Sequence, residues 1–432
     1  MKNILKKTVS LILIFIARQA LARHKPKVVA ITGNVGKTGA KDAIAAVLTR
    51  KYTVRKSDKS FNSDIGVPLA ILGLPNAWAN PFGWFSNFFR GVQEVFSKDF
   101  PQVLVLEVGA DRPRDIADIM KWLKPDIGVV TVMGKIPVHI EFFGSLEEVA
   151  KEKAEVVLAT KESGNVILNF DDKIVSAMAV KSRAQVLTFG FNEGAFVRGE
   201  NSHIYYEGEG IERRPAGTSF KIIYDGNVLP VHLPGIAGKN ASYSALAAFA
   251  CGISFEINPI SILEALGEVN FQPGRMRIIE GNKKTTIIDD TYNSSPVAVE
   301  HALEILSEIE TDGRKIAVIG DMMELGNYTP EAHRSLGTMA SKIVDILVCV
   351  GVRAKFIADG ALSSGMTKKK IMLFDDSLSA GKALDLIIKK GDTILVKGSQ
   401  YMRMERTVLE IMAEPARASE LLVRQEEEWG RR

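Results

Sequence analysis

Residues 28–38 read VVAITGNVGKT. The apolar run at 28–31 predicts a short buried strand, and the run from Thr38 to Leu48 predicts a helix. A glycine turn between a strand and a helix is the context in which backbone N–H groups and the helix N-terminus hold phosphate. Lys37 is placed to neutralise the β- and γ-phosphates of a nucleotide, and the Thr38 hydroxyl is placed to bind Mg²⁺. We therefore expect an ATP site formed by Gly33, Asn34, Val35, Gly36, Lys37 and Thr38.

The spacing of this loop departs from the common phosphate-loop pattern G-x-x-x-x-G-K-[ST], because Ile31 stands where the first glycine belongs. A glycine turn followed by a lysine-capped helix is the plain alternative. The strand before the loop and the helix after it favour the phosphate loop.

The composition indicates a globular protein of more than one domain. The chain has 432 residues, of which 46% are hydrophobic and 25% are charged, which excludes a collagenous or wholly disordered protein. At about 150 residues per domain, the length predicts two or three domains. The two cysteines, Cys251 and Cys349, lie in apolar runs, so we expect buried free thiols and no disulfide framework.

The positive charge is concentrated near the N-terminus. The net charge is +4, yet residues 1–60 hold 14 Lys or Arg side chains and only two acidic ones, Asp42 and Asp58. A nucleic-acid-binding protein needs a basic face with interleaved aromatic residues across a folded domain, so we expect no nucleic-acid partner. An anionic membrane surface or a phosphorylated ligand fits this charge distribution.

The N-terminal segment 1–26 combines basic and apolar residues. The ten-residue apolar run Thr8–Ala17 covers only about 15 Å as a helix, against a hydrocarbon core of about 30 Å. Three interpretations remain: a helix at a membrane interface, a helix packed on the protein, or a secretory signal ending at Ala20-Leu21-Ala22. Because ATP is a cytoplasmic reagent, we expect a cytoplasmic protein. If the segment is an interfacial helix, the protein would lie at the periphery of the inner face of the membrane.

A second apolar segment, residues 74–100, is unusually aromatic. Such stripes are often core, but this one is also suited to a membrane surface together with the N-terminal helix. Its aromatic residues are Trp78, Phe82, Trp84, Phe85, Phe88, Phe89, Phe96 and Phe100.

Further motifs follow the phosphate loop along the chain. They are FNSDIGVP (61–68), LVLEVGADRPRDI (104–116), FGS (143–145), Lys153, NFDD (169–172), GRM (274–276), DDTYNSSP (289–296), GDMMELG (320–326) and KGS (397–399). With TGNVGKT, this ordered set resembles the Mur ligases, which use ATP to join amino acids or peptides to a carboxylate. The resemblance runs from about residue 27 to about residue 410, and the C-terminal motifs are most similar to those of the members that add D-alanyl-D-alanine.

The resemblance implies an ADP-forming carboxylate–amine ligase that works through an acyl phosphate with ATP and Mg²⁺. The expected substrates are a cell-wall peptide precursor and D-alanyl-D-alanine or a similar small amino acid or dipeptide. A poly-γ-glutamate-synthase-like ligase is an alternative, as is a non-catalytic ATP-binding scaffold that works with a partner.

Several residues gain roles from the resemblance. Glu107 ends a buried strand and His139 follows the next predicted strand at 127–131, and both match magnesium ligands of the family. Lys153 lies on a charged predicted helix and matches a lysine of the family that CO₂ carbamylates, which turns a cation into a carboxylate that binds a second Mg²⁺; Thr38 is the other expected metal ligand. The expected catalytic residues are Lys37, His139, Lys153 and Lys397. Beyond the phosphate loop, the expected nucleotide contacts are Asn240, Arg275, Asp290, Tyr292 and Asn293. The expected substrate contacts are Asp321, Glu324 and Lys397.

The chain also departs from the family. Lys239 and Tyr243 replace the adenine-side histidine and the second asparagine of the motif G-H-N-V-x-N, which puts nucleotide contacts there in doubt. About 25 residues precede the first predicted strand, where family members carry a UDP-sugar domain of about a hundred, so we expect that pocket to be absent.

The pattern predicts an α/β protein. Residues 27–272 would form a central P-loop-type ATP-binding domain with a mostly parallel sheet and a β-rich excursion at 200–235. Residues 273–413 would form a C-terminal Rossmann-like α/β ligase domain, and 414–432 a charged tail.

Overall fold

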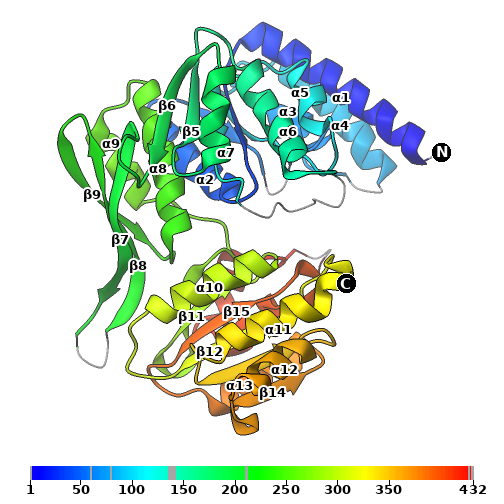
Figure 1. Cartoon of the computed structure of the whole chain (residues 1–432). Helices are drawn as coiled ribbons and strands as arrows, with labels where there is room; N and C mark the ends of the chain where they lie inside the picture. The colour runs from blue at the N-terminus through cyan, green and yellow to red at the C-terminus, as the bar shows by residue number, and fades with distance from the viewer. Residues whose placement is uncertain are drawn as a thin grey trace. The chain divides into compact units, whose positions relative to one another are not determined.

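The computed structural model describes residues 2–58, 61–77, 80–134, 143–209, 213–426 and 429, with side chains from Lys6 onward. Two compact units make up the chain (Figure 1). The first contains Met1–Asn201, Phe220–Val231 and Asn240–Asn270, and the second contains Ser202–Ser219, His232–Lys239 and Phe271–Arg432. Two residues singled out from the sequence, Trp78 and His139, lie outside the described residues.

A parallel sheet forms the centre of the first unit (Figure 1). The strands are β1 (Lys27–Thr32), β2 (Val54–Lys56), β3 (Val103–Glu107), β4 (Ile127–Val130), β5 (Asn165–Asn169) and β6 (Gln185–Gly190). Their order is β2-β3-β1-β4-β5-β6, and every pairing among them is parallel. β1 therefore lies between β3 and β4, and all six strands end at the same edge.

Three long strands continue this sheet to nine. They are β7 (Val197–Glu207), β8 (Arg214–Tyr224) and β9 (Asn227–Pro234), which occupy the segment that was predicted to be β-rich. Parts of these strands belong to the second unit. Their side chains make contacts there: the Tyr206 hydroxyl accepts a hydrogen bond from Glu310 N at 2.7 Å, and Arg214 forms an ion pair with Glu280 at 2.5 Å.

Helices cover the first sheet. They are α1 (Lys2–His24), α2 (Lys37–Thr49), α3 (Gly66–Leu72), α4 (Pro81–Val95), α5 (Asp115–Met120), α6 (Leu146–Ala159), α7 (Lys173–Ser176), α8 (Lys239–Ser254) and α9 (Pro259–Gly267), with a 3-10 turn at Ala177–Lys181. Apolar side chains of α1, α3, α5 and α6 share one core with alternate residues of β1 and β3, such as Ala30 and Leu104.

Helix α1 belongs to this core. Leu13, Ile16, Ala17 and Ala20 are buried in it, which favours the packed helix among the three interpretations of the N-terminal segment. Across the described parts of the chain, no helix is both long and apolar enough to span a bilayer.

The aromatic segment divides between core and surface. Phe100 is buried, and Trp84 and Phe88 pack against the core from α4, as the core interpretation expects. That interpretation is wrong for the remaining described aromatic residues, which are exposed. Phe82, Phe85 and Phe89 occupy the opposite face of α4, and Phe96 directly follows the helix.

The second unit has a six-stranded sheet of its own. Its strands are β10 (Arg277–Gly281), β11 (Thr285–Asp290), β12 (Lys315–Gly320), β13 (Ile346–Val350), β14 (Ile371–Phe374) and β15 (Thr393–Lys397). The order is β10-β11-β15-β12-β13-β14; β10 is antiparallel to β11, and the other pairings are parallel. Its α-helices are α10 (Pro296–Glu308), α11 (Thr329–Ala340), α12 (Lys355–Ser363), α13 (Ser377–Ile387), α14 (Glu405–Ile411) and the single turn α15 (Ala418–Leu421).

Both faces of this second sheet are covered. Ala317 and Ile319 of β12 enter one core, and Ile316 and Val318 enter the other, which is the alternation of a sheet buried on both sides. The predicted α/β fold, with a mostly parallel sheet and a second α/β sheet, is confirmed. The cysteines are buried free thiols, as expected.

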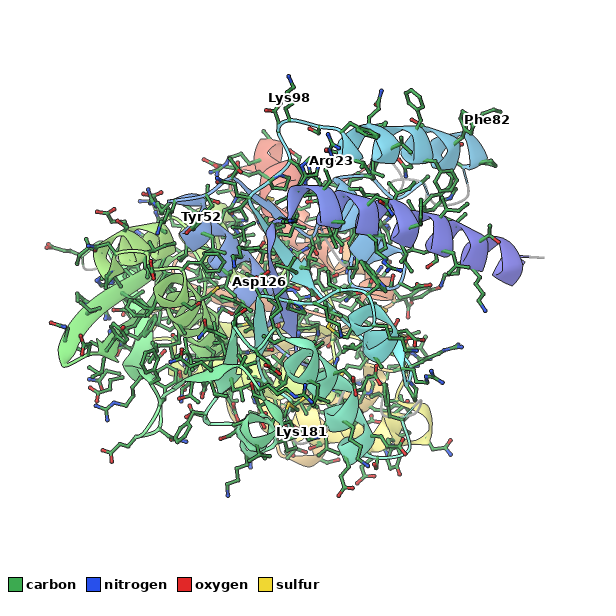
Figure 2. All side chains as sticks on the ribbon, turned by 90° about the horizontal axis from the view of Figure 1, so that it is seen from above. Arg23, Tyr52, Phe82, Lys98, Asp126 and Lys181 are labelled. Carbon is green, nitrogen blue, oxygen red and sulfur yellow. The ribbon has the colours of Figure 1, made fainter. Side chains whose placement is uncertain are left out.

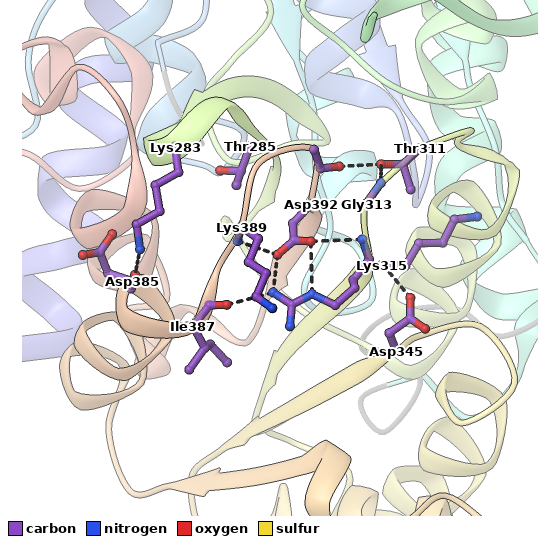
Figure 3. A network of polar contacts seen from close by, with 12 residues as sticks. Lys283, Thr285, Thr311, Gly313, Lys315, Asp345, Asp385, Ile387, Lys389 and Asp392 are labelled. Atoms are coloured by element: carbon purple, nitrogen blue, oxygen red, sulfur yellow. Dashed lines mark hydrogen bonds and ion pairs between the residues drawn. The ribbon is translucent and has the colours of Figure 1, made fainter. Parts of the chain in front are cut away.

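A buried carboxylate fixes the amino ends of β12 and β15. Asp392 accepts hydrogen bonds from Arg314 N at 3.0 Å and Arg314 Nε at 3.1 Å, and pairs with Arg314 Nη2 at 2.6 Å. Thr311 donates to Gly391 O at 2.5 Å beside it (Figure 3). This network uses the amino ends of the strands and leaves their carboxyl ends to other residues.

Helices α11 and α12 pack so closely that their backbones are in contact at Gly337. A Cβ on Gly337 would lie 1.9 Å from Ile357 O, so Gly337→Ala must push the helices apart. We expect the unfolding free energy to fall by about 1–3 kcal/mol, despite the higher helix propensity of alanine. Denaturant unfolding measures it, with Ser335→Ala on the exposed face of α11 as the control; a Gly337→Ala protein as stable as that control would contradict the close packing.

Candidate active site

The loop between β1 and α2 has backbone conformations that require glycine. Gly33 has φ 141° and Gly36 has φ 85°, both in the region that L side chains rarely adopt. A Cβ on Gly33 would also lie 2.1 Å from Thr131 Oγ1. The two glycines of TGNVGKT are therefore dictated by the geometry of the loop.

The segment after β4 anchors this loop. The Thr131 hydroxyl donates to Val35 O at 2.7 Å, and Asn34 N and Val35 N donate to Val132 O at 2.7 and 3.2 Å. The Asn34 side chain donates to Met133 O at 2.7 Å. Thr131 was predicted only as the end of a strand, so its anchoring role was missed.

Lys37 begins α2 and curls over the loop. Its Nζ donates to Gly33 O at 2.9 Å and to Asn34 O at 3.3 Å. Its positive charge therefore lies beside the backbone of the predicted phosphate-binding residues, at the N-terminus of a helix, where anions are favoured.

Thr38 and Glu107 are brought together across the sheet. The Thr38 hydroxyl donates to Glu107 Oε2 at 3.0 Å, and both side chains are buried. Asn62 donates to Glu107 Oε1 at 3.3 Å, which gives a function to the motif FNSDIGVP that the sequence did not reveal. A hydroxyl and a carboxylate side by side next to a phosphate loop fit the ligands that Mg²⁺ takes together with nucleotide phosphates.

Within the part of the chain that the structure describes, carboxylates and imidazoles alone do not form a complete metal site. Across the described ranges, no group of three or more His, Cys, Asp or Glu side chains is arranged to hold a metal ion. Of the four expected metal ligands, Thr38 and Glu107 adjoin, Lys153 lies nearby in charge interaction with Glu107, and His139 is outside the described residues.

Lys153 is buried on α6, not part of a solvated charged face. Burial, reinforced by the positive charge of Lys37, lowers the pKa of Lys153 to about 7; the charges of Glu152, Asp111 and Glu107 oppose the shift. The Glu152 carboxylate accepts from the first N–H groups of α5, including Ile116 N at 2.7 Å. A substantial fraction of Lys153 is therefore a neutral amine near neutral pH.

Asn240 and Tyr243 share a small pocket with the loop. Its lining includes Val35, Gly36, Phe189, Asn240 and Tyr243. The Tyr243 hydroxyl donates to Asp171 Oδ2 at 2.7 Å, and burial together with that carboxylate raises the pKa of the phenol. The residue that departs from the family pattern is thus fixed in the wall of the pocket that Asn240 lines.

In the second unit, Lys397 and Asp290 end neighbouring strands in register. Lys397 is buried, and its Nζ lies 2.6 Å from Asp290 Oδ2 and 2.9 Å from Asn293 O. The adjacent Asp289 is fully buried, and burial raises its pKa to about 7 although Thr291 donates to it twice. Asp290 is therefore the more accessible of the two carboxylates.

Arg275 and Tyr292 stack beside this pair. The Arg275 guanidinium lies 4.0 Å from the Tyr292 ring centroid, and Tyr292 N donates to Gly274 O at 2.9 Å. Arg424 from the C-terminal tail is buried against the same loop and bonds Thr291 O at 3.1 Å and Glu405 Oε2 at 2.9 Å. The charge pattern of the tail gave no signal for this docking.

The GDMMELG loop holds two predicted substrate residues in different surroundings. Asp321 is buried and accepts from Ala354 N at 2.7 Å, whereas Glu324 is exposed. His333 fixes the loop: its Nδ1–H donates to Thr329 O at 2.7 Å, and Nε2 accepts from Met322 N at 3.1 Å. Burial lowers the pKa of this histidine, which sequence reasoning had not selected.

Comparisons with known proteins agree with this geometry. The family model "Mur ligase middle domain" matches residues 89–252, and "Mur ligase, glutamate ligase domain" matches residues 274–400. The UDP-N-acetylmuramoyl-tripeptide–D-alanyl-D-alanine ligase of Mycobacterium leprae is 30% identical over 394 residues, covering 86% of this chain and 71% of the relative. The chain belongs to the Mur ligase family. The enzyme of the same name from Bacillus subtilis is 28% identical over 401 residues, covering 93% of this chain and 79% of its own.

Solved Mur ligases share the fold. MurF ligase from Thermotoga maritima in complex with ADP has a TM-score of 0.74 and 27% identity, covering 92% of this chain and 82% of that one. MurF from Acinetobacter baumannii has a TM-score of 0.76 at 23% identity, and the match covers 93% of this chain and 80% of that one. The family resemblance expected from the ordered motifs is confirmed.

The lowered pKa of Lys153 predicts a pH-dependent stability. As the pH falls from 10.5 to about 7, the unfolded chain binds a proton at this lysine before the folded chain does, so the unfolding free energy decreases. Below about pH 7 both states are protonated and the loss is complete. In CO₂-free buffer, Lys153→Met should therefore be stabilised relative to the parent at pH 7 by on the order of a few kcal/mol, with little difference above pH 10.5.

Denaturant unfolding across this pH range measures the effect. Lys151→Met, an exposed lysine on the same helix, is the control and should follow the parent. A Lys153→Met advantage that is constant from pH 7 to above 10.5 would contradict the assignment.

Proposed function

We propose that this chain is an ATP-dependent, ADP-forming ligase that joins D-alanyl-D-alanine to a carboxylate of a UDP-N-acetylmuramoyl-tripeptide. The observation that carries the proposal is the contact of Thr38 with Glu107 beside the loop that Lys37 covers. Membership of the Mur ligase family and the names of the relatives supply the substrate class.

The chemistry requires charge to be controlled on a phosphoryl group. Amide formation from a carboxylate is uphill in water, so the substrate carboxylate oxygen attacks the γ-phosphorus of ATP and ADP leaves. The amine of the second substrate then attacks the acyl carbon, loses a proton and displaces phosphate. We assign the loop N–H groups and Lys37 to the phosphates of ATP, where positive charge stabilises the transferring group.

We assign Thr38 and Glu107 to Mg²⁺. The ion would supply charge neutralisation on the β- and γ-phosphates. Asn62 orients Glu107 by its hydrogen bond, and the burial of both ligands excludes competing water. His139 remains a predicted magnesium ligand.

We further propose that Lys153 is carbamylated. Its neutral amine adds to the carbon of CO₂ and releases a proton, which replaces a cation by a carboxylate. This relieves the repulsion between Lys153 and Lys37. The carbamate would provide an oxygen ligand for a second Mg²⁺.

For the second unit we propose nucleotide contacts by Arg275, Asp290, Tyr292 and Asn293, as well as by Asn240 of the first unit. Lys397, held by Asp290, is assigned to the acyl phosphate or the incoming amine. Glu324 is assigned to the amino substrate, whereas the inward hydrogen bond of Asp321 supports a structural role. We place the reaction in the cytoplasm, where ATP is available; a lipid surface as partner is a separate proposal.

Phosphate release tests the ligase. With ATP, Mg²⁺ and UDP-N-acetylmuramoyl-tripeptide, we expect ADP and phosphate to form only when D-alanyl-D-alanine is added. Thr38→Val removes the hydroxyl and keeps the shape, so activity should fall by about a hundredfold. The matched control is Thr49→Val at the other end of α2, whose hydroxyl bonds only Ala45 O in the described structure.

The other outcomes identify the alternatives. Phosphate release with glutamate and not with D-alanyl-D-alanine would indicate the poly-γ-glutamate-type ligase. Tight ATP binding without release for any acceptor would indicate the scaffold.

Carbamylation has its own readout. Protein equilibrated with ¹³C-bicarbonate should show a carbamate carbon signal by NMR, which Lys153→Met abolishes and Lys151→Met retains. A parent protein without the signal, at saturating bicarbonate and Mg²⁺, would contradict the carbamate and leave the ligase proposal intact.

A further inference from the structure

Helix α4 exposes its aromatic residues to solvent. Its solvent face carries Phe82, Phe85, Phe89 and Val92, and Phe96 follows in the same stripe, with exposed fractions of 86, 76, 64, 48 and 64%. The spacing of three or four residues places these five side chains, here called the aromatic platform, on one face. The opposite face is anchored, because Trp84, Phe88 and Val95 pack against the core.

Helix α1 lies beside α4 and extends this apolar surface. Leu11, Ile12 and Phe15 are exposed on α1. The two helices approach closely at Gly91, where a Cβ would lie 3.4 Å from Ile16 Cγ2. The His24 Nε2 atom lies 3.0 Å from Val95 O at the other end of the contact.

The charged residues around the platform are mostly basic. Residues 1–26 contain no acidic side chain. Glu94 of α4 is paired with Arg55 at 2.8 Å. The Arg23 guanidinium lies 5.1 Å from the centroid of the Phe96 ring, at the margin of the platform (Figure 2). Exposed basic side chains in residues 1–26 and 74–100 are Lys6, Lys7, Arg18, Arg23, Lys25, Arg90 and Lys98.

The combination of exposed aromatic residues with surrounding basic side chains favours one class of binding partner over others. Contiguous exposed apolar residues mark interaction surfaces. Phenylalanines flanked by Lys and Arg on a surface helix are typical of helices that lie in the headgroup region of a bilayer. A second copy of the chain is disfavoured, because a symmetric contact would bring these basic residues against each other.

We propose that the aromatic platform docks on an anionic lipid bilayer, with the exposed face of α1 beside it. The phenyl rings insert between headgroups, and Arg90, Lys98 and the basic residues of α1 interact with anionic lipid. The platform shares no residue with the proposed active site, so membrane docking and ligase activity are separable.

Vesicle sedimentation of the full chain tests the proposal. We expect it to sediment with phosphatidylcholine vesicles that contain phosphatidylglycerol, and weakly with phosphatidylcholine alone. Phe85→Ser with Phe89→Ser should weaken binding by about tenfold or more. The control pair is Val180→Ser with Leu386→Ser, which removes equally exposed apolar residues elsewhere and should bind like the parent.

Charge is tested separately. Arg90→Glu with Lys98→Glu should remove the preference for anionic vesicles, whereas Lys368→Glu with Lys369→Glu, the same charge change at exposed positions of the second unit, should retain it. Thermal unfolding and phosphate release in solution should match the parent in all four variants.

Three results would overturn the proposal. They are failure of the parent to bind anionic vesicles, equal binding by the platform and control variants, and self-association that the platform variants abolish while vesicles do not bind. The last result would identify a second copy as the occupant.

Discussion

The placement of β1 between β3 and β4 is the constraint on which the candidate site depends. Parallel register pairs Ile31 with Glu107 and Thr32 with Val130, so three strands end together. This brings the glycine loop, the Glu107 carboxylate and Thr131 to one edge of the sheet. Gly33 then has no room for a side chain, and α2 must begin with Lys37 over the loop and Thr38 at Glu107.

Buried charge connects this edge to α6. Lys37 and Lys153 repel each other, and Lys153 has lost much of its hydration, so its neutral form is favoured. Negative charge added beside Lys37 and Lys153 stabilises this arrangement, whether it comes from the phosphates of ATP or from a carbamate on Lys153. In the second unit the opposite solution is present, since Lys397 is neutralised directly by Asp290. The buried lysines Lys153 and Lys397 therefore have different electrostatic surroundings and are suited to different chemical roles.

Much of the fold could be predicted, because strand and helix periodicities are local. The glycine loop, the positions of Thr38 at a helix start and of Glu107 at a strand end, and the α/β alternation could be predicted from short stretches of sequence. The ion pair of Lys397 with Asp290 was not predicted, because the two residues meet only where their strands pair. The contacts of Asn62, His333 and Arg424 were missed, since each bonds residues distant in the chain or lies in a segment without a motif. The aromatic segment was ambiguous because composition does not show which face of α4 meets the core.

The central claim is that Thr38 and Glu107 hold the metal of a nucleotide complex. Its most direct measurement is anomalous X-ray scattering from crystals grown with Mn²⁺ and a non-hydrolysable ATP analogue. We predict a strong peak in bonding contact with Thr38 Oγ1 and a phosphate oxygen, with Glu107 bonded to the ion or to one of its waters. A metal peak remote from Thr38 and Glu107, with the analogue bound, would contradict the account.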